Sequence, residues 1–469
     1  MIPQKIICVD IGSTYTKGAV FNPTEDRFKV GARAVVPTTV NYLPDGFYKV
    51  LEALIPGFGS EHAYDKTDFP VFFSSSAKGG LKIAVVGLVP EMSLNIARLA
   101  AFSAGAKVCA AFPYRLGKSN IAQIESLAPD ILLFCGGTDG GNERYALENS
   151  KMLAASKFSG TIIYAGNNFV ADEVANTLSS KEIVVTENVM PDFGKLNIEP
   201  VREAIRKVFL EKIISGKGLN EIVKKFEALP VPTPLAVFNL AKAIGENVKN
   251  WSNFAIIDMG GATTDFYSYT DAFHYDGETV MKGIVEPLLK RTVEGDLGMR
   301  VSAESACETG TDYFASLGFD DNKLNDLKNY SLKISESPEY LPENETEKMF
   351  DRTLAGACIY HSLLRHAGTI EEVFTIKGRI WAQTGKDLRR INKIIGTGGY
   401  LAAMGRNNEK IIIPSEPTTP CEKIPLLPQK FTYHADNTYV LPLLANLAEK
   451  YPKHCAVTAI DSLINEQQK

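Results

Sequence analysis

The sequence predicts a multidomain α/β protein that contains a doubly wound, parallel module. Apolar strand-like runs alternate with helix-like segments between residues 80 and 187, a pattern typical of βαβ crossovers. A strand–glycine turn–strand pattern occurs near Asp10 and again near Asp258. The length of 469 residues leaves room for about three domains, at roughly 150 residues each.

Composition and charge exclude several classes of protein. Hydrophobic residues make up 45% and charged residues 22% of the chain, an ordinary globular balance. The net charge of −5 predicts no basic surface for a nucleic acid. No apolar run approaches the roughly 18 residues of a membrane span, and no secretory signal is recognised. Seven scattered cysteines form neither a disulfide framework nor a zinc signature. A cytoplasmic protein without nucleic-acid or membrane partners is expected.

The N-terminal region predicts a β-hairpin with an acidic residue at its turn. A short apolar strand at Lys5–Val9 leads into Asp10–Lys17, and a second apolar run follows at Gly18–Phe21. The connection is too short to hold a crossover helix, so the two strands are expected to be antiparallel.

The inserted module follows from about residue 80. Its expected strands are Lys82–Val89, Lys107–Phe112, Asp130–Cys135, Thr161–Ala165 and Ile183–Thr186. Its expected helices are Pro90–Ala104, Ser119–Leu127, Asn142–Ser156 and Asn168–Ser179. Strands separated by helices of this length predict a parallel, doubly wound sheet.

The C-terminal half repeats the hairpin and adds a third glycine turn. An apolar run at Phe254–Ile257 ends in Asp258–Asp265, and a strand-like run follows at Phe266–Thr270. Much later, a strand at Lys393–Ile395 enters the turn Gly396–Gly399 just before a predicted helix.

These three turns indicate phosphate and nucleotide chemistry. Glycines let the backbone approach a ligand closely, and successive N–H groups form a concavity that binds anions. Carboxylates supply the hard oxygen ligands that Mg²⁺ prefers. The candidate donors to phosphate are the turn glycines, the hydroxyls of Ser13, Thr14, Thr263 and Thr264, and the Lys17 cation. The candidate metal and water ligands are Asp10, Asp258 and Asp265. Each turn alone is more often only a turn, but their order and spacing are specific.

The same segments resemble a known superfamily. Asp10–Lys17, Ile256–Asp265 and Ile395–Ala402 are similar to the phosphate-1, phosphate-2 and adenosine motifs of the actin, sugar kinase and heat-shock chaperone ATPases. Gly136–Gly141 and Thr292–Gly298 also resemble segments of one branch, the glutamate mutase accessory family of the MutL (GlmL) type. The resemblance implies an actin-like (ribonuclease H-like), duplicated ATPase core with the α/β module inserted.

On this basis we expect four parts. Residues 1–79 would form the first actin-like subdomain with the phosphate-1 hairpin, and residues 80–187 the inserted module. Residues 188–252 would form a helical connection, and residues 253–469 the second actin-like subdomain with the phosphate-2 and adenosine motifs.

The resemblance also implies a function. The resemblance implies a chaperone-like ATPase that serves an adenosylcobalamin-dependent mutase or aminomutase. Its cofactors would be ATP or ADP and Mg²⁺. Related reactivases use ATP to exchange damaged cobalamin for intact cobalamin. Hydrolysis is expected to be slow and to act as a conformational timer, because no arginine finger is identified from spacing. The mutase served and the state of homo-oligomerisation are left open.

Roles carried over from the family follow the motifs. Asp10 would position Mg²⁺ through water, and Asp258 would be the second acidic group at the metal or at the attacking water. The groups that would hold the β- and γ-phosphates from one side are Gly12, Ser13 and Thr14. Those that would close on them from the other side are Gly260, Gly261, Thr263 and Thr264. Those that would contact the nucleoside are Gly396, Gly398 and Gly399.

Four residues keep two interpretations each. Asp265 would polarise a nucleophile or cap its own turn. Lys17 would bind phosphate or extend into solvent. Glu294 and Asp296 would lie near the metal or in an interdomain contact, or else in an ordinary loop or helix cap.

Other features carry weaker hypotheses. Gly136–Gly141 follows a buried strand at the carboxyl edge of the module, where α/β folds place ligand sites. Two interpretations of this segment stay open: a second site for a partner or small ligand, and a flexible loop. Gly117–Ser119 lacks the earlier glycine of a P-loop, because Phe112 stands there. His361 and His366 do not share a helix face, so a metal pair is not expected.

Two other functions of the same fold stay open. A small-molecule kinase would need a substrate-binding loop and a base beside the phosphates, and no sugar- or acetate-type substrate motif is recognised. A non-catalytic interaction protein would bind nucleotide only to set its shape or to assemble.

Overall fold

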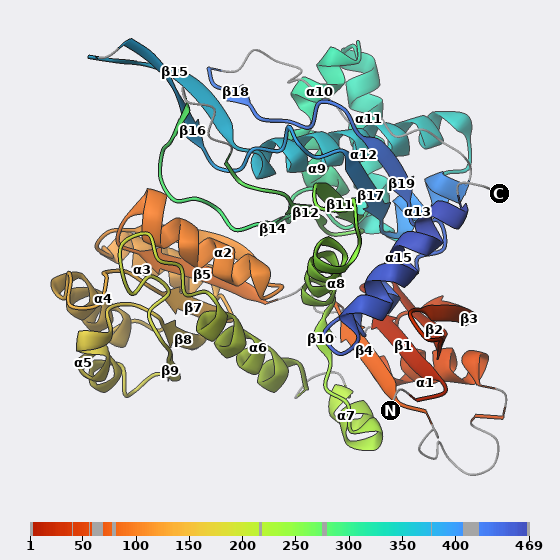
Figure 1. The fold of residues 1–469 in the computed structure, drawn as a ribbon, viewed down its shortest axis with the longest axis horizontal. Helices are drawn as coiled ribbons and strands as arrows, with labels where there is room; N and C mark the ends of the chain where they lie inside the picture. Colours follow the sequence, from red (N-terminus) through yellow and green to blue (C-terminus); the bar gives the residue numbers. More distant parts are fainter. Residues whose placement is uncertain are drawn as a thin grey trace. The chain divides into compact units, whose positions relative to one another are not determined.

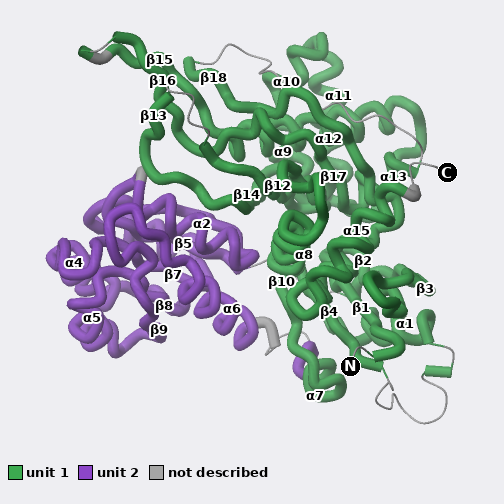
Figure 2. The backbone as a smooth tube through the Cα atoms, viewed as in Figure 1, with its two compact units in different colours: residues 1–77, 221–469 green, residues 78–220 purple. Residues whose placement is uncertain are grey.

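Two compact units make up the fold (Figure 2). The computed structural model describes residues 3–39, 41–55, 57–58, 69–76, 81–214, 218–273, 279–376, 378–406 and 422–466. Residues 1–77 and 221–469 form the first unit, and residues 78–220 form the second. Helix α6 (Glu199–Ile214), predicted as part of a connection, belongs to the second unit. The four-part division of the chain stays a prediction.

The first half of the first unit is built on a five-stranded mixed sheet. Its strands are β1 (Ile6–Ile11), β2 (Tyr15–Pro23), β3 (Phe28–Pro37), β4 (Val71–Ser75) and β10 (Val231–Pro232). They lie in the order β10-β4-β1-β2-β3. The pairs β1–β2 and β2–β3 are antiparallel, whereas β1–β4 and β4–β10 are parallel. All six residues of β1 are buried, as expected for a central strand covered on both faces.

The second half of this unit carries a second five-stranded sheet. Its strands are β11 (Phe254–Met259), β12 (Thr264–Tyr269), β14 (Leu289–Glu294), β17 (Lys393–Thr397) and β19 (Thr432–Ala435). They lie in the order β14-β12-β11-β17-β19. The pairs β11–β12 and β12–β14 are antiparallel, and β11–β17 and β17–β19 are parallel. Strand order and directions therefore repeat those of the first sheet, and the predicted actin-like, duplicated core is confirmed.

Helices between the two sheets form their shared core (Figure 1). Figure 1 shows α8 (Thr233–Asn247) and α15 (Pro452–Glu466) there, and residues of α14 (Leu441–Ala445) belong to the same buried cluster. Helix α8 has a proline in its first turn. The proline costs the helix no hydrogen bond there, because N–H groups of the first turn have no acceptor within the helix. One buried cluster joins Phe21 of the first sheet, Leu240 of α8, Tyr267 of the second sheet and Ile460 of α15. The core therefore connects the two sheets and keeps the two hairpins in the same region of the first unit.

Several elements cover the second sheet or extend from it. The helices are α9 (Ala303–Thr309), α10 (Thr311–Ser316), α11 (Asp321–Glu336), α12 (Glu345–His366) and α13 (Gly399–Arg406). Asp320 and Asn344 cap α11 and α12, because each side chain accepts a backbone N–H of the first turn. A small sheet that the sequence did not predict contains β13 (Thr279–Met281), β15 (Thr369–Thr375), β16 (Gly378–Thr384) and β18 (Ile424–Pro425). Helix α1 (Leu43–Leu54) packs against strands β1, β2 and β3 of the first sheet.

The second unit is a parallel, doubly wound module, as predicted. Its strands are β5 (Lys82–Gly87), β6 (Lys107–Pro113), β7 (Ile131–Phe134), β8 (Thr161–Tyr164) and β9 (Ile183–Val185). Its other helices are η1 (Pro90–Leu94), α2 (Asn95–Ser103), α3 (Lys118–Leu127), α4 (Arg144–Ala154), η2 (Asn168–Val170) and α5 (Ala171–Thr177). All strand pairs are parallel, in the order β6-β5-β7-β8-β9. Helix α7 (Leu219–Phe226) begins at the boundary between the units. Among the helices described, none has the length and apolar character needed to cross a bilayer.

A buried histidine makes the stability of the first unit depend on pH. His366 is fully buried, with Nε2 2.7 Å from Ser268 Oγ and Nδ1 2.8 Å from Thr292 Oγ1. Burial lowers its pKa well below the ordinary value, and the nearby Lys290 and Lys386 ammonium groups act in the same direction. In the unfolded chain this imidazole titrates near pH 6.5.

We predict that the first unit loses stability as the pH falls below about 6.5, because only the unfolded state then gains a proton at His366. The loss is about 1.4 kcal/mol per pH unit for one such group. Urea unfolding followed by tryptophan fluorescence measures this unit, since both tryptophans, Trp251 and Trp381, lie in it. The His366→Gln variant is expected to show a shallower pH dependence between pH 5 and 6.5. Parallel curves for the two proteins would contradict the prediction.

Candidate functional site

The two predicted hairpins occupy equivalent places in their sheets. Asp10 lies in β1 and pairs across the hairpin with Lys17, and Asp258 lies in β11 and pairs with Asp265. Each acidic residue precedes a short connection, which we call the first glycine turn (Gly12–Thr14) and the second glycine turn (Gly260–Thr263). Because β1 and β11 are the central strands of sheets with one topology, both turns leave corresponding edges.

Asp10 is held in one orientation by three hydroxyl groups. The carboxylate is 1% exposed. Its Oδ1 accepts hydrogen bonds from Ser74 Oγ at 2.8 Å and Thr233 Oγ1 at 2.7 Å, and its Oδ2 accepts one from Tyr439 Oη at 3.2 Å. Oδ2 therefore keeps a lone pair for one further donor, such as a water molecule. Sequence reasoning named none of these three partners, because they come from distant segments of the chain.

Asp258 is the less restrained of the two carboxylates. It is half-buried, and no described residue donates a hydrogen bond to it. Burial raises the pKa of Asp258 to about 7. The negative charges of Asp265 and Asp10 act in the same direction, whereas Lys17 opposes the shift. Asp10 and Asp258 are therefore close enough for their charges to interact, and the described residues leave the Asp258 carboxylate without a hydrogen-bond donor.

Lys17 lies among carboxylates instead of extending into solvent. Its Nζ is 3.2 Å from the centroid of the Tyr439 ring, a cation–π contact. Burial lowers the pKa of Lys17, while the charges of Asp10, Asp258 and Asp436 raise it. Lys17 thus partly neutralises the group of acids that surrounds it.

Tyr439 is a site residue that sequence reasoning missed. Its ring faces Lys17, its hydroxyl reaches Asp10, and its φ is +55°. A bulky residue in this left-handed region is a genuine conformational outlier, of the kind found at functional sites. Asp436 fixes the turn, because its carboxylate accepts the backbone N–H groups of Val440 and Leu441 at the start of α14.

The first glycine turn presents unpaired donors. Thr38 holds two of its carbonyls, since its Oγ1 donates to Gly12 O and its N–H donates to Thr14 O, both at 2.9 Å. In a trans peptide the C=O and N–H point in opposite directions, so the Ser13 N–H faces away from Thr38. Within the described chain, nothing accepts the backbone N–H or the hydroxyl of Ser13 or Thr14. Such a turn is suited to an anion.

The second glycine turn approaches the first. A β-carbon built on Gly261 would lie 3.8 Å from Thr14 Oγ1. The turn is closed by a hydrogen bond of 2.9 Å from Gly260 N to Thr263 O. Thr264 does not contribute the predicted hydroxyl, because its side chain is buried and Oγ1 donates to Leu297 O at 2.7 Å.

Asp265 is engaged in a buried ion pair. Arg291 Nε donates to Asp265 Oδ1 at 2.8 Å, and a second guanidinium nitrogen also contacts the carboxylate. Thr263 Oγ1 donates to Oδ2 at 3.3 Å. Burial raises the pKa of Asp265, and Arg291 opposes the shift. These contacts favour the interpretation that Asp265 caps its turn, and they leave it poorly placed to polarise a nucleophile.

The third glycine turn (Gly396–Gly399) packs on the end of β11. Gly398 has φ +102°, and a β-carbon there would lie 2.1 Å from Met259 O. A β-carbon on Gly396 would lie 1.8 Å from Tyr433 Oη. Both glycines are buried and are required by packing, whereas Gly399 is exposed at the start of α13 with no atom within 4 Å of its β-carbon position. Gly399 is therefore the member of this turn best placed to meet a ligand.

Glu294 and Asp296 share one arginine. Arg365 Nη1 donates to Glu294 Oε2 at 2.6 Å and to Asp296 Oδ1 at 2.8 Å, and Nη2 donates to Asp296 Oδ2 at 2.8 Å. Burial raises the pKa of Glu294, against the effect of Arg365. This pairing favours an anchoring role over the predicted alternative of a role at a metal.

A magnesium ion is compatible with the acids that are present. Among the described residues, no group of three His, Cys, Asp or Glu side chains is arranged to hold a metal. Mg²⁺ does not require one, since it keeps several waters and is bound through one or two carboxylates together with substrate phosphates. Asp258, to which no residue in the described part of the chain donates, and the remaining lone pair on Asp10 Oδ2 fit that donor set.

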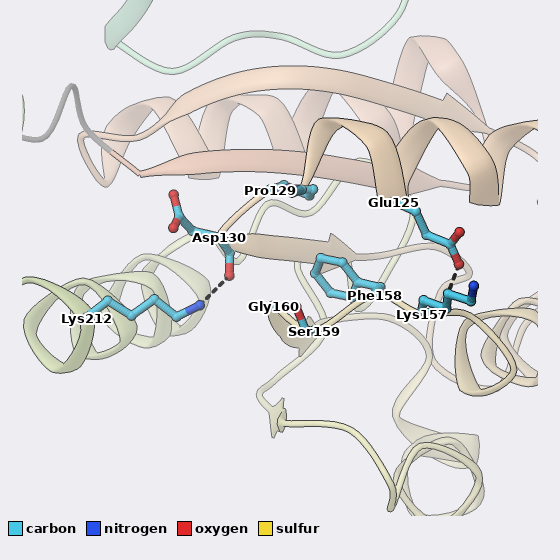
Figure 3. Close-up of a pocket in the computed structure, with 9 residues that line it drawn as sticks. Glu125, Pro129, Asp130, Lys157, Phe158, Ser159, Gly160 and Lys212 are labelled. Carbon is cyan, nitrogen blue, oxygen red and sulfur yellow. Dashed lines mark hydrogen bonds between the residues drawn. The ribbon is translucent and has the colours of Figure 1, made fainter.

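Two further features belong to the second unit. Gly136–Gly141 follows β7, and Asp139 Oδ1 ties this loop to Asn168 N and Asn188 Nδ2, both at 2.8 Å. A small cavity of about 220 Å³ lies where β7 and β8 begin (Figure 3), and Lys212 Nζ donates to Asp130 O beside it. None of the residues that line this cavity is a candidate site residue from the sequence. The cavity lies at the amino ends of the strands, whereas α/β sheets bind ligands at the carboxyl ends.

Comparison with known proteins identifies relatives over nearly the whole chain. A family model described as MutL protein matches residues 6–463. Protein MutL of Clostridium tetanomorphum is 36% identical over 452 residues, which cover 95% of this chain and 96% of that protein.

Similarity to solved structures is low. A glycerol dehydratase reactivase has a TM-score of 0.32 and 11% identity, covering 95% of this chain and 100% of the other. The activator of the 2-hydroxyisocaproyl-CoA dehydratase from Clostridium difficile with bound ADPNP has a TM-score of 0.25 and 9% identity, covering 99% and 98%. Similarities of this size do not establish a shared mechanism.

The third glycine turn provides a matched pair of variants. We predict that Gly398→Ala lowers the free energy of unfolding by about 2–4 kcal/mol, because the new methyl group overlaps Met259 O and φ is positive. Gly399→Ala is expected to change it by less than about 0.5 kcal/mol, as for an exposed position. Urea unfolding followed by tryptophan fluorescence measures both. Equal stability of the two variants would contradict the packing described for Gly398.

Proposed function

The chain belongs to the MutL protein family, and from this membership we propose that it is an ATP-dependent, chaperone-like accessory factor for an adenosylcobalamin-dependent mutase. One observation carries the nucleotide part of the proposal. Two glycine turns with unpaired N–H groups approach each other beside Asp10, Asp258 and Lys17. This combination of anion donors and available carboxylates suits a magnesium–polyphosphate ligand.

Each turn would hold one side of the phosphate chain. Ser13 and Thr14 would donate backbone and hydroxyl hydrogen bonds from the first turn, and Gly261 and Thr263 would donate backbone N–H groups from the second. Lys17 would balance the charge of the carboxylates around it. Bound Mg²⁺ would neutralise charge on the phosphate oxygens, with Asp258 and Asp10 Oδ2 as its protein ligands.

The reaction would be transfer of a phosphoryl group to water. Such chemistry depends on positioning and charge stabilisation more than on covalent catalysis. Asp10, held by three hydroxyls, would orient a metal-bound water, and Asp258 would orient the metal or the attacking water. Arg291 is paired with Asp265, so its guanidinium is not free to stabilise charge on the phosphate. Slow turnover is therefore expected, because an arginine that stabilises the transition state accelerates related reactions by large factors.

ATP would act by joining the two halves of the first unit. The first glycine turn belongs to one sheet and the second to the other. A γ-phosphate contacted by both turns would favour a closed arrangement, and hydrolysis would release it. Converting a mostly open population into a mostly closed one requires a preference of about 5 kcal/mol for the closed state.

We predict that Asp10→Asn and Asp258→Asn each lower the rate of ATP hydrolysis by about 100-fold or more, because both remove a charge that positions the metal and water. In Asp10→Asn, the amide would also oppose one of the hydroxyl donors. Steady-state phosphate release with and without Mg²⁺ measures the effect. Wild-type rates in both variants would refute the assignment of these acids.

A matched control for this experiment is Asp130→Asn in the second unit, which leaves both glycine turns intact.

The same assay with a candidate mutase added separates the proposed accessory function from the alternatives. A small-molecule kinase would phosphorylate a metabolite. A non-catalytic interaction protein would bind nucleotide without turnover that a mutase stimulates.

The second unit is proposed to act on the partner protein. We predict that replacing residues 78–220 with a flexible linker retains nucleotide binding, since no candidate nucleotide residue lies in that segment. Stimulation of, or binding to, the mutase is expected to be lost. Calorimetric titration with nucleotide and co-purification with the mutase measure the two effects. A folded deletion variant that binds the mutase normally would refute this role for the second unit.

A further inference from the structure

One chain segment holds the second glycine turn from behind. This clasp segment (Gly295–Ser302) directs hydrogen-bond donors at three successive carbonyls of the turn. Met299 N donates to Gly260 O at 3.1 Å, and Arg300 N donates to Gly261 O at 2.8 Å. Ser302 Oγ donates to Ala262 O at 2.8 Å.

This arrangement fixes the direction of the N–H groups in the turn. Because each peptide unit is trans and planar, its N–H points away from its own C=O. With the carbonyls of Gly260, Gly261 and Ala262 directed at the clasp segment, the next three N–H groups point away from that segment. In the part of the chain that the structure describes, no acceptor receives these N–H groups of Gly261, Ala262 and Thr263. Successive N–H groups of this kind form an anion-binding concavity.

The clasp segment is itself tied to two helices. Arg300 makes a two-pronged ion pair with Asp351 of α12, at 3.1 Å from Nη1 to Oδ1 and 2.9 Å from Nη2 to Oδ2. Asp351 is 2% exposed and also accepts a hydrogen bond from Tyr330 of α11 at 3.0 Å. A paired guanidinium and carboxylate fixes direction as well as distance.

Close backbone packing completes the clasp. A β-carbon on Gly298 would lie 2.5 Å from Ala262 C and 2.6 Å from Gly261 O, so only glycine fits there. Leu297 O accepts the Thr264 hydroxyl. These contacts give a physical reason for the glycine that ends the segment Thr292–Gly298, which the sequence singled out.

We propose that Arg300 and Asp351 are positioning residues that hold the second glycine turn in its anion-binding form. This inference rests on the proposed function of the site. Neither side chain need touch the ligand, because both act through the clasp segment. If the ion pair is removed, the clasp segment loses its tether and the glycine peptides of the turn are free to rotate. Affinity for a polyphosphate should then fall, while affinity for a nucleoside without phosphates should not.

The test compares three ligands on the full-length protein. Calorimetric titrations use a non-hydrolysable ATP analogue with Mg²⁺, ADP with Mg²⁺, and adenosine. The variants are Arg300→Met, Arg300→Lys and the double variant Arg300→Met/Asp351→Leu, which leaves no unpaired buried charge. Arg379→Met removes an exposed ion pair of the β15–β16 hairpin and serves as the control.

The expected result is a selective loss of phosphate affinity. Arg300→Met and the double variant should bind the ATP analogue about 10-fold more weakly or worse, equivalent to one or two hydrogen bonds. Adenosine binding should stay within about twofold of wild type, and Arg300→Lys should recover part of the lost affinity. A general loss of structure would instead weaken all three ligands.

A milder variant keeps the proposal testable if the Arg300 variants do not fold. Ser302→Ala removes only the hydroxyl that holds Ala262 O, and it should weaken the ATP analogue by about 3-fold with adenosine unchanged. Wild-type affinity for the analogue in Ser302→Ala and in every folded Arg300 variant would overturn the positioning role. If the wild-type protein binds none of the three ligands, the proposed function itself fails.

Discussion

The apolar core between the two sheets is the constraint on which the candidate site depends. Helices α8 and α15 pack against side chains from both sheets, among them Phe21 and Tyr267. Asp10 and Asp258 lie on the strands that border this core, at equivalent places in two sheets of one topology. Without the shared core, each hairpin would be an ordinary turn that carries one acid.

Hydrogen bonds from other segments to the backbone carbonyls of both glycine turns set the direction of the N–H groups in those turns. Thr38 engages the first glycine turn, and the clasp segment engages the second. A peptide whose carbonyl is fixed also has a fixed N–H direction. The donors for an anion are therefore organised before any ligand arrives, which reduces the ordering that binding would otherwise require.

Prediction from the sequence succeeded where the signal is local. The strands of the second unit and both hairpins follow from apolar runs separated by glycine turns or helix-like segments. Prediction failed where a side chain meets a partner that is distant in the chain. Thr264 turned inward to Leu297 O, Arg291 was not foreseen as the partner of Asp265, and Tyr439 was not foreseen as a partner of Asp10. The small sheet with the β15–β16 hairpin was also missed, since β13 and β18 are short and β15 and β16 are mixed in polarity.

The sequence by itself determined the kinds of groups available and the order in which they occur. It placed an acid and a glycine turn at the end of two strands, a third glycine turn before a helix, and a βαβ module between them. Only the tertiary structure decided which of these groups stay open to a ligand. Hydrogen bonds and ion pairs between remote segments occupy Thr264 and Asp265, orient Asp10, and leave Asp258 without a donor from the described chain. Those contacts depend on how the sheets pack, and local spacing along the chain carries no record of that packing.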